Sequence, residues 1–152
     1  MRAHAKDSFV SGLLSPLDLR SGMMGLVNAG HVLPLLIRGD AISTVQLPAD
    51  RPFGLNAERS YRVTDLQLLP GDRLVIVTDG MLERRAAALP LTALLEQTRT
   101  LHPREATRHL ADTVLEVAGP QLADDATILM LDCHGQHQRH RDSHAGVRCE
   151  RR

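Results

Sequence analysis

The stretch LVIVTDGMLE, from Leu74 to Glu83, decides the fold. It opens with aliphatic and β-branched residues, reaches Thr-Asp-Gly at 78–80 and then becomes amphipathic. A short continuous apolar run of this kind is typical of a strand that is covered on both faces. The stretch therefore predicts a buried strand over residues 73–78 that delivers a carboxylate, Asp79, at its end.

The composition is that of a single globular domain with an aliphatic core. The chain has 152 residues, of which 43% are hydrophobic, but Phe9, Phe53 and Tyr61 are its only aromatic residues. A shortage of aromatic side chains disfavours the stacking surfaces that bind single-stranded nucleic acid. A formal net charge of zero provides no general attraction for nucleic acid or anionic lipid. We therefore expect neither nucleic acid nor a membrane as a partner.

The cysteines and the ends of the chain indicate a cytoplasmic protein. Cys133 and Cys149 lie near or in the C-terminal tail and do not form a disulfide framework, so we interpret both as free thiols. No stretch is apolar for long enough to span a membrane, and the N-terminal residues lack the apolar segment of a signal peptide.

The first half of the chain predicts strands joined by short turns. Turn residues separate the expected strands, and strands joined by such short connections must be antiparallel. A receiver-like or nucleotide-binding domain with a parallel sheet is the alternative, and these short turns disfavour it because parallel strands need long crossovers. The expected strands cover residues 9–17, 23–28, 33–38, 42–47, 61–69 and 73–78.

The second half predicts two helices and one more strand. Leucines at helical spacing favour a helix over 89–100, and Pro103 is placed to open a second helix that Gly119-Pro120 would end. Residues 126–131 form a final apolar run, whereas residues 134–152 have no apolar periodicity and predict a disordered, His- and Arg-rich tail. The pattern is that of an α+β fold with a mainly antiparallel sheet.

Two carboxylates lie at the edges of apolar strands. Asp79 follows the strand at 73–78, and Asp124 precedes the strand at 126–131. If these strands are antiparallel neighbours, both carboxylates emerge at one edge, where a cation between them would relieve their repulsion. Oxygen ligands of this kind suit Mg²⁺ or Mn²⁺. The alternative is that both aspartates serve only as turn residues.

The stretch Asn28-Ala29-Gly30-His31 is a third polar site at a strand end. It reads most simply as an exit turn in which Gly30 adopts a positive φ angle. His31 as a general acid is the alternative hypothesis for the same residues.

Taken in order, several motifs resemble the second half of a PPM-type metal-dependent protein serine/threonine phosphatase of the SpoIIE-like branch. The motifs are NAGHVLPLLIRGD, RPFGL, LLPGDRLVIVTDGMLERR and ADDATILML, and the resemblance covers about residues 8–133. It implies a partial αββα sandwich that hydrolyses phosphoserine or phosphothreonine with Mg²⁺ or Mn²⁺. It also implies that Asp79 and Asp124 are metal ligands, that Asp125 supports them, and that the substrate is a regulatory phosphoprotein such as an anti-sigma-factor antagonist.

The sequence departs from this family pattern in its first half. The Gly-Asp motif, whose aspartate bridges two metals in the family, has no match here, since Asp7 stands between Lys6 and Ser8. We therefore expect weak metal binding by this chain alone, and a sheet with uncovered apolar faces that favour self-association. The alternative to an active phosphatase is a catalytically incomplete fragment that acts as a binding module or has no activity.

Overall fold

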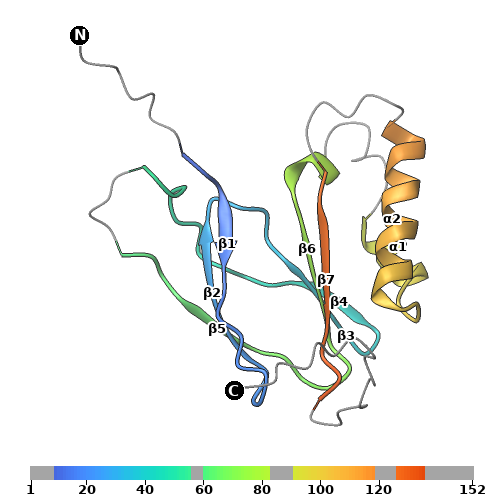
Figure 1. The fold of residues 1–152 in the computed structure, drawn as a ribbon, viewed down its shortest axis with the longest axis horizontal. Coiled ribbons are helices and arrows are strands. Elements are labelled where there is room, and N and C mark those ends of the chain that lie inside the picture. Colours follow the sequence, from blue (N-terminus) through green and yellow to red (C-terminus); the bar gives the residue numbers. More distant parts are fainter. Residues whose placement is uncertain (1–8, 56–59, 83–90, 119–125, 136–152) are drawn as a thin grey trace, which may run out of the picture.

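The computed structural model describes residues 9–55, 60–82, 91–118 and 126–135. These residues form three layers, a small sheet, a larger sheet and a pair of helices (Figure 1). The expected α+β class with antiparallel sheets is confirmed. The elements are β1 (Gly12–Leu14), β2 (Met23–Ala29), β3 (Leu35–Arg38), β4 (Ala41–Thr44), β5 (Thr64–Gln67), β6 (Arg73–Val77), the 3₁₀ helix η1 (Asp79–Leu82), α1 (Leu91–Gln97), α2 (Pro103–Ala118) and β7 (Ile128–Asp132).

Every strand pairing among the described residues is antiparallel. The first sheet has the order β1-β2-β5, and the second has the order β4-β3-β6-β7. The hairpin β3–β4 forms as the Gly39-Asp40 turn predicts. The alternative of a receiver-like domain with a parallel sheet is therefore wrong.

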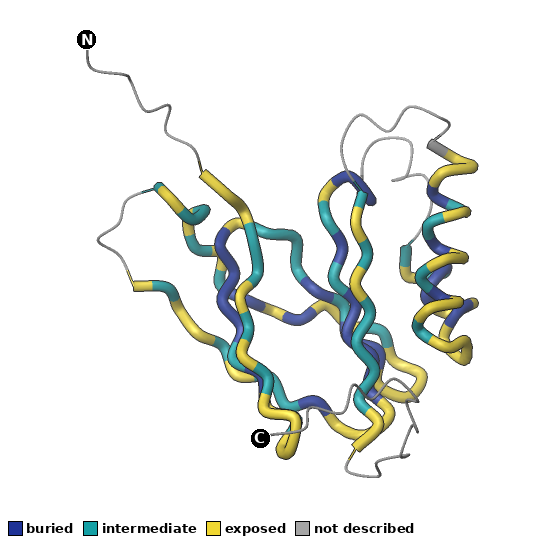
Figure 2. The backbone as a smooth tube through the Cα atoms, viewed as in Figure 1, coloured by how far each residue is buried: buried dark blue, intermediate teal, exposed yellow. Residues whose placement is uncertain are grey.

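Strand β6 is the central element that the opening stretch predicts. It lies between β3 and β7, and its side chains alternate between two apolar layers. Leu74 packs between the two sheets, whereas Val75 and Val77 pack toward the helices. The strand is dark along much of its length in Figure 2, which confirms that both of its faces are covered.

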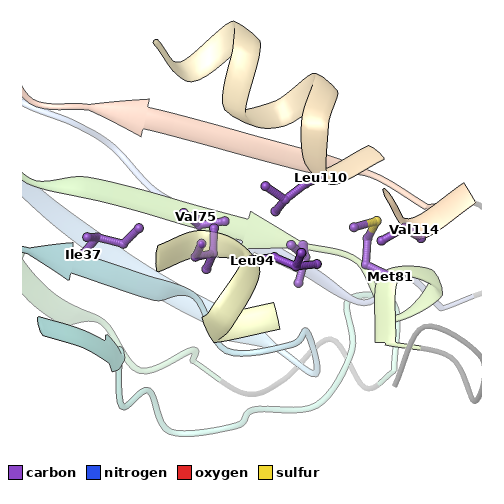
Figure 3. Close-up of a cluster of buried hydrophobic side chains, with 8 residues drawn as sticks. Ile37, Val75, Met81, Leu94, Leu110 and Val114 are labelled. Atoms are coloured by element: carbon purple, nitrogen blue, oxygen red, sulfur yellow. The ribbon is translucent and has the colours of Figure 1, made fainter. Parts of the chain in front are cut away.

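Two clusters of aliphatic side chains hold the layers together. One lies between the sheets and includes Leu26 and Leu74. The other lies between the second sheet and the helices, where Val75, Leu94 and Leu110 approach one another (Figure 3). No Phe or Tyr belongs to either cluster, as the composition leads us to expect.

The second helix, α2, begins at Pro103 as predicted, and the buried residues that the structure describes on it lie in about its first three turns. Ala106, Leu110 and Val114 are buried against the second sheet. Val117 lies nearly one turn beyond Val114 and is 41% exposed, because the buried cluster ends at Val114. The first helix, α1, ends at Gln97 and not at the expected residue 100, whereas residues 89–90 of that prediction lie outside the described residues.

Three strand predictions were wrong in their limits, and the expected strand at 61–69 is regular only over β5. The expected strand at 9–17 is broken: only β1 is regular, and Leu17 pairs with Met24 as an isolated bridge beyond it. The expected strand at 42–47 begins at Ala41 and ends at Thr44. The Val45 N–H still donates to the carbonyl of Pro34, which lies opposite it in the register of β3 and β4, but Pro34 has no N–H to return the bond and the ladder ends there.

The outer face of the β1-β2-β5 sheet carries exposed apolar side chains. Residues of β2 alternate, so that Met24 and Leu26 point between the sheets and Met23 points outward. Val63 lies over Gly25 on this outer face and is 64% exposed, and Leu14 of β1 is exposed as well. Among the described residues the helices pack only on the second sheet (Figure 1), so this face has no helical cover.

The Pro70-Gly71-Asp72 turn is stabilised by a buried carboxylate. Asp72 accepts hydrogen bonds from the Nε and NH2 groups of Arg38, at 3.0 and 2.7 Å, and from the N–H of Leu69 at 2.7 Å. Burial acts to raise the pKa of Asp72, but the bonds from Arg38 and Leu69 and the Arg38 charge outweigh it and lower that pKa. The turn therefore depends on an ionised Asp72.

We expect this carboxylate to contribute to acid unfolding. Because the folded-state pKa of Asp72 is lowered, its contribution to stability is present above the unfolded-state pKa and is lost as pH falls toward the folded value. Urea unfolding measured from neutral pH to acid should show a shallower loss of stability for Asp72→Asn than for the parent chain. Asp65→Asn, at an exposed position of β5, is the control, and equal slopes for Asp72→Asn and the parent would contradict the assignment.

Candidate metal site at the end of β6

The last residues of β6 and the first residues of β7 form one edge of the second sheet. Val77 pairs with Ile128, and the ladder continues as the N–H of Thr78 donates to the carbonyl of Thr127 at 3.1 Å. The N–H of Thr127 in turn donates to Oγ1 of Thr78 at 2.9 Å. The expectation that these two strands are antiparallel neighbours is confirmed, so the chain leaves β6 and enters β7 at the same place.

Asp79 lies directly at this edge, at the start of η1. The Met81 N–H donates to the Thr78 carbonyl at 3.0 Å, which closes the 3₁₀ turn and leaves Asp79 exposed. The only hydrogen bond to the Asp79 carboxylate in the described part of the chain comes from the Gly80 N–H, at 3.1 Å to Oδ1. Its second oxygen is thus available as a ligand for a hard cation.

The other predicted site residues lie outside the described residues. Asp124 and Asp125 come just before Ala126, where the described part of the chain resumes ahead of β7. Within residues 9–55, 60–82, 91–118 and 126–135, no group of three or more His, Cys, Asp or Glu side chains is arranged to hold a metal ion. The structure thus places one of the two predicted ligands, Asp79, and its pairing with Asp124 stays a prediction.

The Asn28–His31 stretch forms a turn at the end of β2, with Asn28 and Ala29 buried and Gly30 exposed. Asn28 is buried; its Oδ1 accepts the His31 N–H at 2.7 Å, and its Nδ2 donates to the His31 carbonyl at 3.1 Å. Gly30 has a φ angle of 73°, as the turn interpretation predicts. Nδ1 of His31 lies 2.9 Å from the Val32 carbonyl, so this ring is oriented by the backbone of its own turn. These contacts favour a structural role over the general-acid hypothesis.

A second group of residues, Asp50 and Arg62, is hydrogen-bonded to this turn and is not predicted from the sequence. The Asp50 N–H donates to the Asn28 carbonyl at 2.9 Å, and the Asp50 carboxylate accepts the Nε of Arg62 at 2.9 Å and the Arg62 N–H at 2.8 Å. The bonds from Arg62 lower the pKa of Asp50. Since the two residues are twelve positions apart in an irregular loop, no periodic signal in the sequence marks their pairing.

This fold is that of the PP2C-type phosphatases. The phosphatase domain of SpoIIE from Bacillus subtilis superposes with a TM-score of 0.64 at 21% identity, covering 91% of this chain and 63% of that domain structure. The structure of the RsbU and RsbW domains of a Mycobacterium tuberculosis protein gives a TM-score of 0.66 at 25% identity, with 79% of this chain and 35% of that one covered.

The sequence comparisons identify the family. Residues 1–134 match the family model described as Stage II sporulation protein E (SpoIIE), so the chain belongs to this family. Stage II sporulation protein E from Bacillus subtilis (strain 168) is 26% identical over 122 residues, which cover 78% of this chain and 15% of that protein. The chain thus spans only a small part of its curated relative. None of the helices in its described part has the length and apolar character needed to cross a membrane.

Proposed function

We propose that this chain is the C-terminal portion of a metal-dependent protein serine/threonine phosphatase domain, and that Asp79 and Asp124 are its metal ligands. The observation that carries the proposal is the register of β6 and β7, in which Thr78 and Thr127 are hydrogen-bonded neighbours. Asp79 follows Thr78 directly. Asp124 stands three residues before Thr127, a separation of at most about 10 Å of extended chain.

Three residues at this edge, Asp79, Gly80 and Thr78, each have a defined role in this proposal. Asp79 offers one free carboxylate oxygen to the ion, and the Gly80 N–H orients its other oxygen. Thr78 ties the entrance of β7 to the end of β6, which holds the two ligand-bearing segments together. The ion, when bound, supplies Lewis-acid activation of a phosphoryl group and of water. A Mn-presoaked structure of the SpoIIE phosphatase domain supports Mn²⁺ or Mg²⁺ as the choice.

A catalytically incomplete, phosphatase-like binding module is the second candidate. It is favoured by the donor set, because the described residues provide a single carboxylate at this edge and no cluster of three ligands. A site with two carboxylates binds a hard cation loosely and lacks the bridging ligand that two adjacent cations require.

Titration with Mn²⁺ tests the metal site. Paramagnetic broadening of amide NMR signals should be largest at Thr78–Met81 and Thr127, and Asp79→Asn should weaken Mn²⁺ binding by about tenfold, since one charged ligand is lost. Asp124→Asn should have a similar effect, whereas Asp65→Asn on β5 should have none. Binding that is unchanged in both Asp79→Asn and Asp124→Asn would rule out the proposed ligands.

A phosphatase assay then separates the two candidate functions. Hydrolysis of a phosphoserine peptide that requires Mn²⁺ and disappears in Asp79→Asn would establish the enzyme and eliminate the binding module. Mn²⁺ binding without turnover would favour the incomplete module.

The proposed substrate is a phosphoserine or phosphothreonine on a regulatory protein such as an anti-sigma-factor antagonist. The structural similarity to a protein that joins RsbU and RsbW domains supports a regulatory setting. We further expect copies of the chain to associate through the uncovered outer face of the β1-β2-β5 sheet. The free thiol of Cys133 supports the cytoplasm as the location.

A further inference from the structure

A cavity with both polar and apolar lining residues lies beside the Asn28–His31 turn, and Asp79 is not among those lining residues. Its volume is about 400 Å³, and it lies between the segment that follows β4 and the segment that leads into β5. We call it the Arg51 pocket and define it by its lining residues, which are Ala49, Asp50, Arg51, Leu55, Ser60, Tyr61 and Arg62. In Figure 1 this part of the chain and η1 both lie toward the upper end of the two sheets.

Arg51 differs from the other arginines that line or support the sheets. Arg38, Arg62, Arg73 and Arg99 each form an ion pair with an aspartate. Arg51 is exposed and makes no hydrogen bond or ion pair in the described part of the chain. The neighbouring carboxylate, Asp50, is already engaged by Arg62. Counted over the residues that the structure describes, the pocket therefore presents one uncompensated positive charge.

The backbone on both sides of Arg51 is held in place. The Asp50 N–H donates to the Asn28 carbonyl, and Pro52 lies so close to Gly30 that a Cβ built there would be 3.1 Å from the Pro52 Cγ. Phe53 exchanges two backbone hydrogen bonds with Val10, at 2.9 and 2.8 Å. An arginine on a fixed backbone loses less conformational entropy when it binds a ligand than one on a free loop.

We propose that the Arg51 pocket binds an oxyanion of a peptide, the carboxylate or phosphate of an acidic segment of the protein substrate. A guanidinium group matches both anions through paired hydrogen bonds, and the lining residues Ser60 and Tyr61 bring hydroxyl donors. This inference rests on the proposed function, because it assigns the pocket to the same phosphoprotein that Asp79 and Asp124 would process. Arg51 is in this view a specificity-determining residue.

Peptide titration of the whole chain without metal tests this proposal. Amide NMR spectra would be followed with a short phosphoserine peptide, with its aspartate and serine counterparts, and with inorganic phosphate. The two anionic peptides should shift the signals of Asp50 and Ser60–Arg62, and Arg51→Ala should weaken their binding about tenfold, as expected for a lost charge-assisted contact. The serine peptide should bind weakly to both proteins, and Arg51→Lys should restore part of the affinity.

Arg104→Ala is the matched control, because it removes an exposed arginine from the start of α2. Equal binding by Arg51→Ala and the parent chain would overturn the proposal, and so would an equal loss in Arg104→Ala. Inorganic phosphate that binds as tightly as the peptides would overturn the peptide assignment. Since no metal or turnover is involved, a failure here leaves the role of Asp79 intact, and a failure of Mn²⁺ binding leaves the pocket intact.

Discussion

Replacing Arg73 with alanine should lower the free energy of unfolding by about 3–5 kcal/mol, the range found when one partner of a buried ion pair is removed. The Arg73 side chain is 8% exposed. Its Nε and NH2 groups bind the two Asp132 oxygens at 2.6 and 2.9 Å, and its NH1 and NH2 groups donate to the carbonyls of Thr98 and Leu101 at 3.2 and 2.7 Å. The substitution leaves a carboxylate and two carbonyls without these donors.

A double substitution distinguishes the net contribution of the Arg73–Asp132 ion pair from the cost of leaving one buried charge without its partner. In Arg73→Met/Asp132→Leu both charges are replaced by apolar groups, so the loss of stability should be much smaller than in Arg73→Ala. Urea unfolding followed by circular dichroism gives the free energies, with Arg104→Ala as an exposed control. If Arg73→Ala and Arg104→Ala unfold at the same urea concentration, the pair does not stabilise the fold as described.

Replacing Leu110 with alanine should cost about 2–5 kcal/mol, the range for deleting a buried leucine side chain. Leu110 is fully buried where α2 packs on the second sheet, within the same cluster as Val75, Leu94 and Leu95. The cost combines the lost burial of apolar surface with the cavity that rigid neighbours cannot fill.

The matched control for Leu110 lies on the same helix. Leu115 is 50% exposed, so Leu115→Ala makes the same chemical change at a cost of at most about 1 kcal/mol. Both variants would be compared by thermal and urea unfolding. Similar losses for the two substitutions would show that α2 does not pack through the Leu110 face.

The sequence predicts the elements whose signals are local and misses the contacts that depend on distant partners. The buried strand β6, the antiparallel hairpins and the start of α2 at Pro103 follow from apolar runs, turn residues and proline placement. The wrong limit of β4 depends on its partner strand, since Pro34 lies opposite Val45 in the register of β3 and β4 and has no N–H to continue the ladder.

The same distinction applies to the candidate site. Asp79 was predicted because it ends an apolar strand, and the structure places it at the edge that β6 and β7 share. The Asp50–Arg62 pair was not predicted, and neither was an Arg51 with no partner among the described residues. The sequence around them has no periodicity, and the position of Asp50 depends on a backbone bond to the Asn28 turn. Charge alone did not distinguish Arg51 from the other arginines of the sequence.

The uncovered face of the first sheet has a consequence for how the chain behaves in solution. Leu14, Met23 and Val63 expose apolar surface there, whereas the second sheet is shielded by α1 and α2. Salts such as sulfate strengthen the burial of apolar surface because they are excluded from it. Salting out should therefore begin at this face while the helical layer stays folded, and dilution in low salt is the condition that keeps single copies apart.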